Sequence, residues 1–194
     1  MDEIQQSGPA YEFKPSVFGA PSQFRATPTG VHWTMGRRSG VIRYADIRRV
    51  QMSYRPAGLL ARNFRTEIWS ASVPKLRIDS QSWKSMVEKA QQFGPYREFV
   101  TTLHRKIVEA KGSPELVSGI QPFLYWPAVA VFSAVSIGLA GLIVRALQSS
   151  AWGGAVFVAT FLALFLWQIG RYLRDNRPGR YVAGELPQVL LPPV

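Results

Sequence analysis

Cysteine is absent from this sequence of 194 residues, and histidine occurs only twice. Without thiols the chain has no disulfide bond, no thiolate nucleophile and no cysteine-ligated metal. His32 and His104 are far apart in the sequence, and no cluster of His and Glu surrounds either of them. Glycine-rich phosphate loops, nucleophile elbows and HExxH motifs are absent as well. We therefore expect a protein that is not an enzyme and that carries no metal or other cofactor.

Acidic residues are scarce: 12 Asp and Glu stand against 23 Lys and Arg, which gives a formal net charge of +11. Residues 1–122 hold 18 basic and 10 acidic side chains, a net charge of +8, whereas residues 123–150 hold one charged side chain, Arg145. The first 19 residues contain no apolar run, so we expect no cleavable secretory signal. The chain thus has a basic part followed by a nearly uncharged part.

Two long segments have no charged residue at all, namely the 22 residues 123–144 and the 19 residues 152–170. At about 1.5 Å per residue, each helix would be roughly 30 Å long, which is the thickness of the hydrocarbon layer of a bilayer. A helix of a soluble protein keeps a polar face, and neither segment has one. The alternative, a buried helix pair, would need more surrounding protein than the preceding 120 or so residues provide. The sequence therefore predicts a transmembrane helical hairpin.

The flanks of the hairpin predict its orientation. Aromatic residues occur where the first segment begins and the second ends, as expected at a membrane interface: Tyr125, Trp126, Trp167 and Tyr172. Four arginines follow the second segment: Arg171, Arg174, Arg177 and Arg180. Because positive residues favour the cytoplasmic side, we expect a multi-pass protein of the cell inner membrane with both termini in the cytoplasm and the connecting loop outside.

Small residues recur at every fourth position of both segments: Ala130, Ala134 and Gly138 in the first, and Ala155, Ala159 and Ala163 in the second. Such rows let helix backbones approach closely in lipid. One interpretation is that they pack the hairpin against itself. The other is that they contact a helix of a second copy or of another membrane protein.

The part of the chain ahead of the hairpin alternates apolar and polar residues, which is typical of half-buried strands. The alternating stretches are residues 31–36, 50–55, 64–69 and 76–78. Turn-forming residues lie around and between them, at 28–30, 38–40, 56–58 and 72–74. This spacing predicts five or more antiparallel strands in a small sandwich or open barrel.

A change of period follows the strands. Apolar residues fall at helical spacing from Tyr96 to Ala110, Gly112 is a candidate C-cap, and a shorter helical stretch is expected at residues 83–93. His104 lies beside the apolar stripe and is interpreted as a boundary residue rather than a base. The fold class that we predict is α+β: a small antiparallel β sandwich or barrel closed by a C-terminal helix, followed by a two-helix transmembrane hairpin.

Five segments result from this division. They are an N-terminal segment (1–20), a cytoplasmic domain (21–112), a linker (113–122), the transmembrane hairpin (123–174) and a cytoplasmic tail (175–194). The tail contains four prolines from Asn176 onward and is expected to be extended or loose.

The order of strands and helix, together with GVIRYADIRRV at residues 40–50, resembles bacterial membrane proteins with a pleckstrin-homology-like (PH-like) domain. In that pattern an apolar strand meets a short Tyr-x-Asp-Ile turn that leads into the next strand. We expect Asp46 to cap the backbone of the turn, and Tyr44, Ile47 and Val50 to face inward. The resemblance covers residues 21–112, implies a PH-like fold and supplies no catalytic residues. In that group the helices often precede the domain, whereas here they follow it.

Arginines are concentrated in the predicted strands and turns, and they are the candidate contacts for anionic lipid: Arg37, Arg38, Arg43, Arg48, Arg49 and Arg55. Each basic group near an anionic leaflet contributes about 1 kcal/mol. We therefore expect a non-enzymatic module that contacts anionic headgroups of membrane lipids or an acidic partner. The alternatives are an ordinary solvated surface, or a scaffold that recruits another membrane protein through its helices. Nucleic-acid binding is not expected, because arginine and aromatic neighbours on a strand point to opposite faces.

Overall fold

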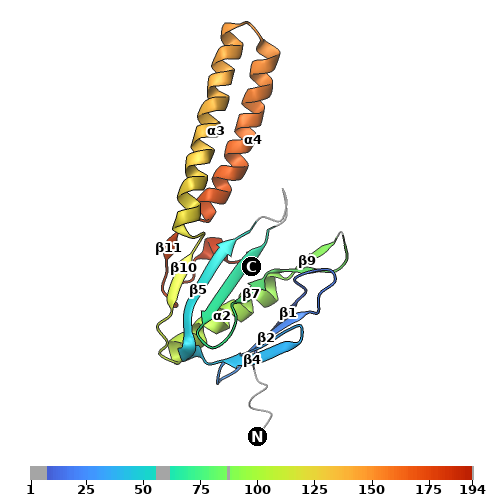
Figure 1. Cartoon of the computed structure of the whole chain (residues 1–194), viewed down its shortest axis with the longest axis vertical. Helices are drawn as coiled ribbons and strands as arrows, with labels where there is room; N and C mark the ends of the chain where they lie inside the picture. Colours follow the sequence, from blue (N-terminus) through green and yellow to red (C-terminus); the bar gives the residue numbers. More distant parts are fainter. Residues whose placement is uncertain (1–7, 56–61, 87, 194) are drawn as a thin grey trace. The chain divides into compact units, whose positions relative to one another are not determined.

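The computed structural model describes residues 8–55, 62–86 and 88–193, which form two compact units. The globular unit contains the described residues up to Gly119 together with those from Gly179 onward, and the helical unit is Ile120–Pro178. The helical unit is therefore an insertion between two parts of the globular unit, and Figure 1 shows its two helices and the strands of the globular unit.

The first sheet of the globular unit is an antiparallel meander in the order β1-β2-β3-β4. Its strands are β1 (Ala10–Phe13), β2 (Ser22–Ala26), β3 (Val31–Met35) and β4 (Arg38–Ile42). Strand β1 lies in the predicted N-terminal segment. The turn expected at residues 38–40 is wrong, because β4 already begins at Arg38 and the chain reverses at Gly36 with a φ of +61°, where glycine is favoured. The turn expected at 56–58 lies outside the described residues.

The second sheet has the order β11-β10-β5-β6-β7. Its strands are β5 (Ile47–Tyr54), β6 (Phe64–Ser70), β7 (Leu76–Asp79), β10 (Glu115–Ser118) and β11 (Gly179–Arg180). Strand β10 is parallel to β5, and the other pairs are antiparallel. Residues predicted as linker and as tail therefore form two neighbouring strands of one sheet.

A two-stranded hairpin of β8 (Gln81–Trp83) and β9 (Lys89–Gln91) leads into the helix α2 (Phe93–Glu109). The short helix expected at residues 83–93 is wrong, because the two ends of that stretch pair as strands. The predicted apolar stripe of α2 is confirmed from Tyr96 to Ile107, since Tyr96, Phe99, Leu103 and Ile107 are all buried. Its last predicted member, Ala110, is exposed and is the C-cap in place of Gly112.

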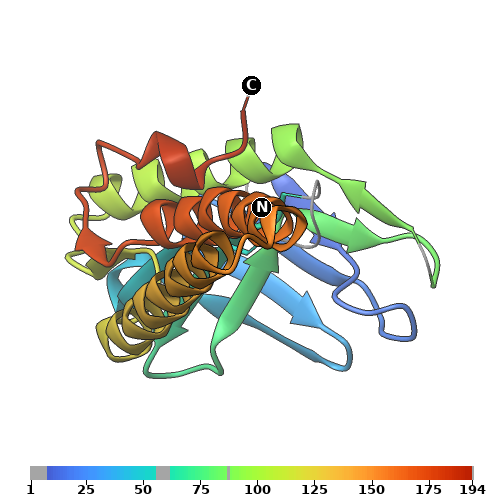
Figure 2. The ribbon, with the colours of Figure 1, turned by 90° about the horizontal axis from the view of Figure 1, so that it is seen from above.

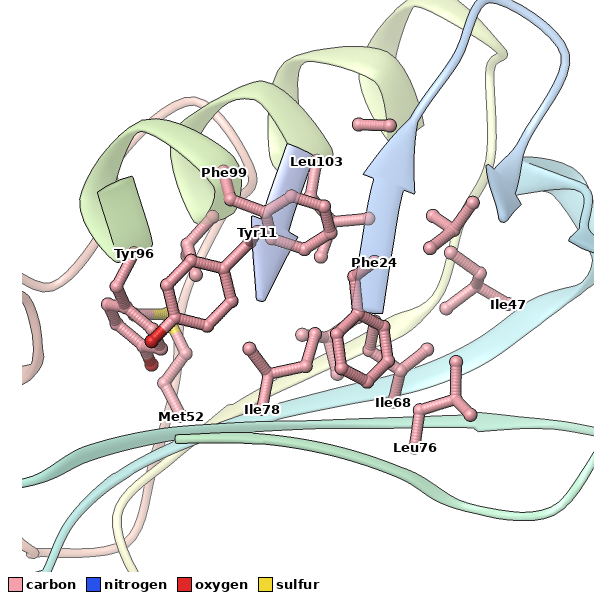
Figure 3. Close-up of a cluster of buried hydrophobic side chains, with 14 of the residues drawn as sticks. Tyr11, Phe24, Ile47, Met52, Ile68, Leu76, Ile78, Tyr96, Phe99 and Leu103 are labelled. Carbon is pink, nitrogen blue, oxygen red and sulfur yellow. The ribbon is translucent and has the colours of Figure 1, made fainter. Parts of the chain in front are cut away.

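A single core joins α2 and both sheets (Figure 3). Tyr11 of β1 lies edge-on to Tyr96 with 5.9 Å between ring centroids, and Phe24 of β2 approaches Phe99 at 6.3 Å. The hydroxyl groups of Tyr96 and Thr66 are 2.7 Å apart, so this buried tyrosine has a hydrogen-bond partner on β6. Burial of these large rings is the main stabilising contribution to the globular unit.

The C-terminal tail packs onto the same core. Leu190 in the short helix η2 (Gln188–Leu190) and the following Leu191 are 3 % and 4 % exposed. Nη1 of Arg97 donates to the carbonyl of Pro192 at 2.6 Å, so the tail lies beside α2 (Figure 2). Of the expected extended or loose tail, the loose alternative is wrong, because the two leucines bury apolar surface that a free tail would expose to water.

The helical unit consists of α3 (Pro122–Gln148) and α4 (Trp152–Asp175), which are long and apolar enough to cross a membrane. They are antiparallel neighbours, with the rings of Phe132 and Phe165 stacked at 5.2 Å. The predicted combination of antiparallel sheets, a helix and two long apolar helices is confirmed.

Candidate functional site

The Tyr-x-Asp-Ile turn forms the short helix η1 (Tyr44–Asp46) between β4 and β5. The Tyr44 hydroxyl donates to the carbonyl of Thr27 at 2.7 Å, and burial raises the pKa of Tyr44 to about 12. Tyr44, Ile47 and Val50 face inward, as expected. Asp46 does not cap the turn, because its carboxylate accepts from Nε of Arg43 at 2.8 Å. Arg43, a candidate lipid contact, is thus paired.

Two further candidates, Arg37 and Arg38, are exposed at the connection between β3 and β4. Neither has an acidic partner among the described residues. Arg48 is exposed too, and it is the extra residue of a bulge in β5, since Ile47 pairs with Ser70 and Arg49 with Trp69.

Arg49 points to the outer face of the second sheet. Its Nε lies 3.7 Å from Glu115 of β10, and its guanidinium lies 5.4 Å from the centre of the Trp69 ring. Nη2 of Arg180 on β11 contacts the same Glu115 at 3.2 Å. Arg49 and Arg180, which the sequence placed in separate basic groups, therefore share one carboxylate.

Arg55 lies at the opposite end of β5 from Arg48. Seven steps of about 3.3 Å separate the two residues, or roughly 23 Å. The six candidate arginines therefore do not form one patch. Beside β5, β10 runs in parallel and pairs Ser118 with Met52 before the chain leaves for the helical unit. Arg55 is thus at the departure end of the sheet, by which we mean the end where the chain leaves the globular unit after Ser118.

Arg62 is a second exposed arginine at the departure end. It lies two residues before β6, whose Phe64 pairs with Tyr54 of β5. Like Arg55, it has no acidic partner among the described residues. The sequence named Arg55 as one of six candidates but did not place it beside Arg62, because only the strand register shows that the two lie at the same end of the sheet.

The arginines that follow the second apolar segment differ in their contacts. Nε of Arg171 and of Arg174 lie 3.6 and 3.7 Å from the carboxylate of Asp175. Arg177 is exposed and has no acidic partner among the described residues. One carboxylate thus offsets part of the positive charge at the end of α4.

The small residues of the helical unit are mostly outside the contact between α3 and α4. Ala155 is buried, at 4 % exposed. The others are exposed: Ala130, Ala134, Gly138, Ala159 and Ala163. A Cβ atom added to Gly138 would meet nothing within 4 Å. The hairpin packs through larger side chains such as Phe132 and Phe165.

Comparisons of the chain with protein-family models, with curated proteins and with solved structures found no match. The function proposed for the chain therefore rests on the placement of its charged residues, its strand register and its two apolar helices.

Proposed function

We propose that this chain is an integral inner-membrane protein whose globular unit is a PH-like module on the cytoplasmic side. A meander of four strands, three further antiparallel strands and then α2 follow one another in the order that such a domain requires. Closure of the two sheets into a barrel is part of this proposal. The β8–β9 hairpin and the added strands β10 and β11 are departures from that pattern.

The helical unit spans the bilayer twice and holds both termini in the cytoplasm. Its support is the uncharged length of α3 and α4 and the excess of arginine after α4. Each connection to the globular unit is short, residues 119–121 on one side and 176–178 on the other. The four steps from Ser118 to Pro122 cover at most roughly 14 Å. The departure end of the sheet is therefore tethered close to the headgroups.

The module contacts anionic lipid headgroups with the departure end of the sheet. The observation that carries this proposal is the pair of exposed arginines there, Arg55 and Arg62, which lack acidic partners among the described residues. Two such groups near an anionic leaflet contribute about 2 kcal/mol. Arg48, roughly 23 Å away along β5, has the same charge but lies at the far end.

Because Arg48 has the same charge as Arg55 and Arg62 but a different position, it serves as the matched control in an experiment on the full-length chain in lipid nanodiscs. Hydrogen–deuterium exchange of peptides from the end of β5 and the start of β6 is compared in phosphatidylcholine and in phosphatidylcholine with phosphatidylglycerol. We expect slower exchange with the anionic lipid, loss of this effect in R55Q/R62Q and at high salt, and its retention in R48Q. Equal exchange in the two lipids would reject headgroup contact at this end.

A second candidate function is assembly with another copy through the helical unit, favoured by the exposed row of Ala130, Ala134 and Gly138. The absence of cysteine allows single-cysteine crosslinking in native membranes. A covalent dimer with G138C but not with S136C would support assembly, since Ser136 is half-buried. Failure of both variants to crosslink would reject this face as a contact between copies.

A further inference from the structure

A polar cavity of about 160 Å³ opens between the end of β1, the start of β6, the end of β7 and the β8–β9 hairpin. The lining residues that matter here are Lys14, Asn63, Arg65, Asp79, Trp83 and Lys89. At about 30 Å³ for each water molecule, the cavity has room for roughly five of them. Its volume fits a small group, and its mostly charged and amide lining favours a polar group over an apolar ligand.

The walls of the cavity are fixed by hydrogen bonds between buried polar side chains. Nδ2 of Asn63 donates to Asp79 at 3.1 Å, and the Ser80 hydroxyl donates to Oδ1 of Asn63 at 3.3 Å. Asn63, Asp79 and Ser80 are at most 9 % exposed. Because burying polar groups is costly unless they are bonded, this network holds the wall in one arrangement.

The opposite wall is tied to the end of β1. The backbone N–H of Lys14 donates to the hydroxyl of Ser82 at 2.9 Å, and the N–H of Trp83 donates to the carbonyl of Lys14 at 3.2 Å. The ammonium group of Lys89 lies 4.1 Å from the centre of the Trp83 ring. Two lysines from distant parts of the chain are thus brought to one cavity.

The charge of the cavity is positive. Asp79 is offset by Arg65, whose Nε and Nη2 donate to the two carboxylate oxygens at 2.7 and 3.2 Å. Lys14 and Lys89 have no acidic partner among the described residues. The lining therefore has an excess of two positive charges, which disfavours a cation and favours a dianion.

We propose that this cavity binds a phosphate monoester group, with Lys14 and Lys89 as its ligands and Arg65 as a third nearby cation. Such a group carries a charge of about −1.5 to −2 at neutral pH, which balances the two excess positive charges of the lining. The strand register pairs Arg65 with Ser53, next to Met52 and Ser118, so the cavity lies toward the departure end of the sheet. Both a lipid headgroup and a soluble phosphate compound offer this chemistry.

The primary test uses the full-length chain in phosphatidylcholine nanodiscs and inorganic phosphate as the probe, measured by isothermal titration calorimetry. We expect saturable binding that K14Q/K89Q weakens by about tenfold or more, because each lost charge-assisted contact is strong. K84Q is the matched control, since Lys84 belongs to the same hairpin but pairs with Glu88 at 3.4 Å. Equal affinity of K14Q/K89Q and the unaltered chain, or no saturable binding, would overturn the proposal.

A second titration, in nanodiscs that contain phosphatidic acid, distinguishes a lipid headgroup from a soluble compound as the source of the phosphate group. Weaker apparent binding of inorganic phosphate would support the cavity as a headgroup site. Unchanged binding would support it as a site for a soluble phosphate compound. Because the first titration contains no anionic lipid, it is independent of the headgroup contact proposed for Arg55 and Arg62.

Discussion

Nε2 of His104 lies 2.8 Å from the hydroxyl oxygen of Tyr181, a residue of the tail 77 positions later in the chain. Nδ1 of the same imidazole lies 2.8 Å from the carbonyl of Val100. A carbonyl only accepts, so Nδ1 carries the proton and Nε2 accepts from the tyrosine hydroxyl. The interpretation of His104 as a boundary residue beside the apolar stripe is wrong, because it is fully buried, and its hydrogen bond to Tyr181 joins α2 to the tail.

This pair predicts a loss of stability in mild acid. Burial lowers the pKa of His104 below its ordinary value of 6.5, so the unfolded chain takes up a proton first as the pH falls. The stability due to neutral His104 is present above pH 6.5 and is lost below it, by up to about 1.4 kcal/mol per pH unit. H104Q retains an acceptor without titrating. Thermal unfolding in detergent between about pH 7 and 5 should be less pH-dependent for H104Q, and equal slopes would contradict the prediction.

The docked tail predicts an unusual sensitivity near the end of the chain. L190A removes a side chain that is 3 % exposed, and it should lower the free energy of unfolding of the globular unit by about 2–4 kcal/mol. V189A is the control, because the neighbouring Val189 is 62 % exposed. Urea unfolding, followed by tryptophan fluorescence, measures both. A negligible effect of L190A would mean that the tail is not part of the folded core.

The ion pair between Arg65 and Asp79 predicts a large cost for removing one charge. The two side chains are 20 % and 11 % exposed, so D79N leaves a largely buried guanidinium without its counter-ion. We expect a loss of about 2–3 kcal/mol in the free energy of unfolding. D46N breaks the pair with Arg43, which is 77 % exposed and screened by water, and should cost much less than D79N. Equal costs for both variants would contradict this assignment.

The proposed topology is testable because the chain has no native cysteine. In intact cells, a membrane-impermeant maleimide should label S150C in the loop between α3 and α4. It should label S85C, exposed in the globular unit, only after the membrane has been permeabilised. Labelling of S85C in intact cells would contradict the proposed orientation and would place the globular unit outside.

Periodic stretches of sequence predicted their structures well, because a half-buried strand or helix leaves its own period in the sequence. Residues 64–69 alternate and form most of β6, and the stripe from Tyr96 to Ile107 forms the buried face of α2. The two uncharged segments correctly predicted α3 and α4, because their composition alone distinguishes them from the rest of the chain. The local sequence pattern was sufficient to predict these elements, because their structure could be identified without knowing which segment they pack against.

Prediction failed where a partner distant in sequence determines the structure. Glu115–Ser118 is too short to show a period, and it is a strand only because β5 and β11 bind its two edges. The residues of the cavity are isolated in sequence, and no local pattern connects Lys14 with Lys89. The arginines, conversely, are close in sequence, yet the extended β5 separates Arg48 from Arg55.

Insertion of the helical unit between β10 and β11 couples the order of synthesis to folding. Val117 pairs with Arg180, so the edge of the second sheet and the leucines of the tail are completed only after both helices have been made. If α3 and α4 cross the bilayer as proposed, a chain with only one helix inserted would leave its last residues on the wrong side. Its globular core would stay incomplete, which would expose the misinserted protein to quality-control proteases.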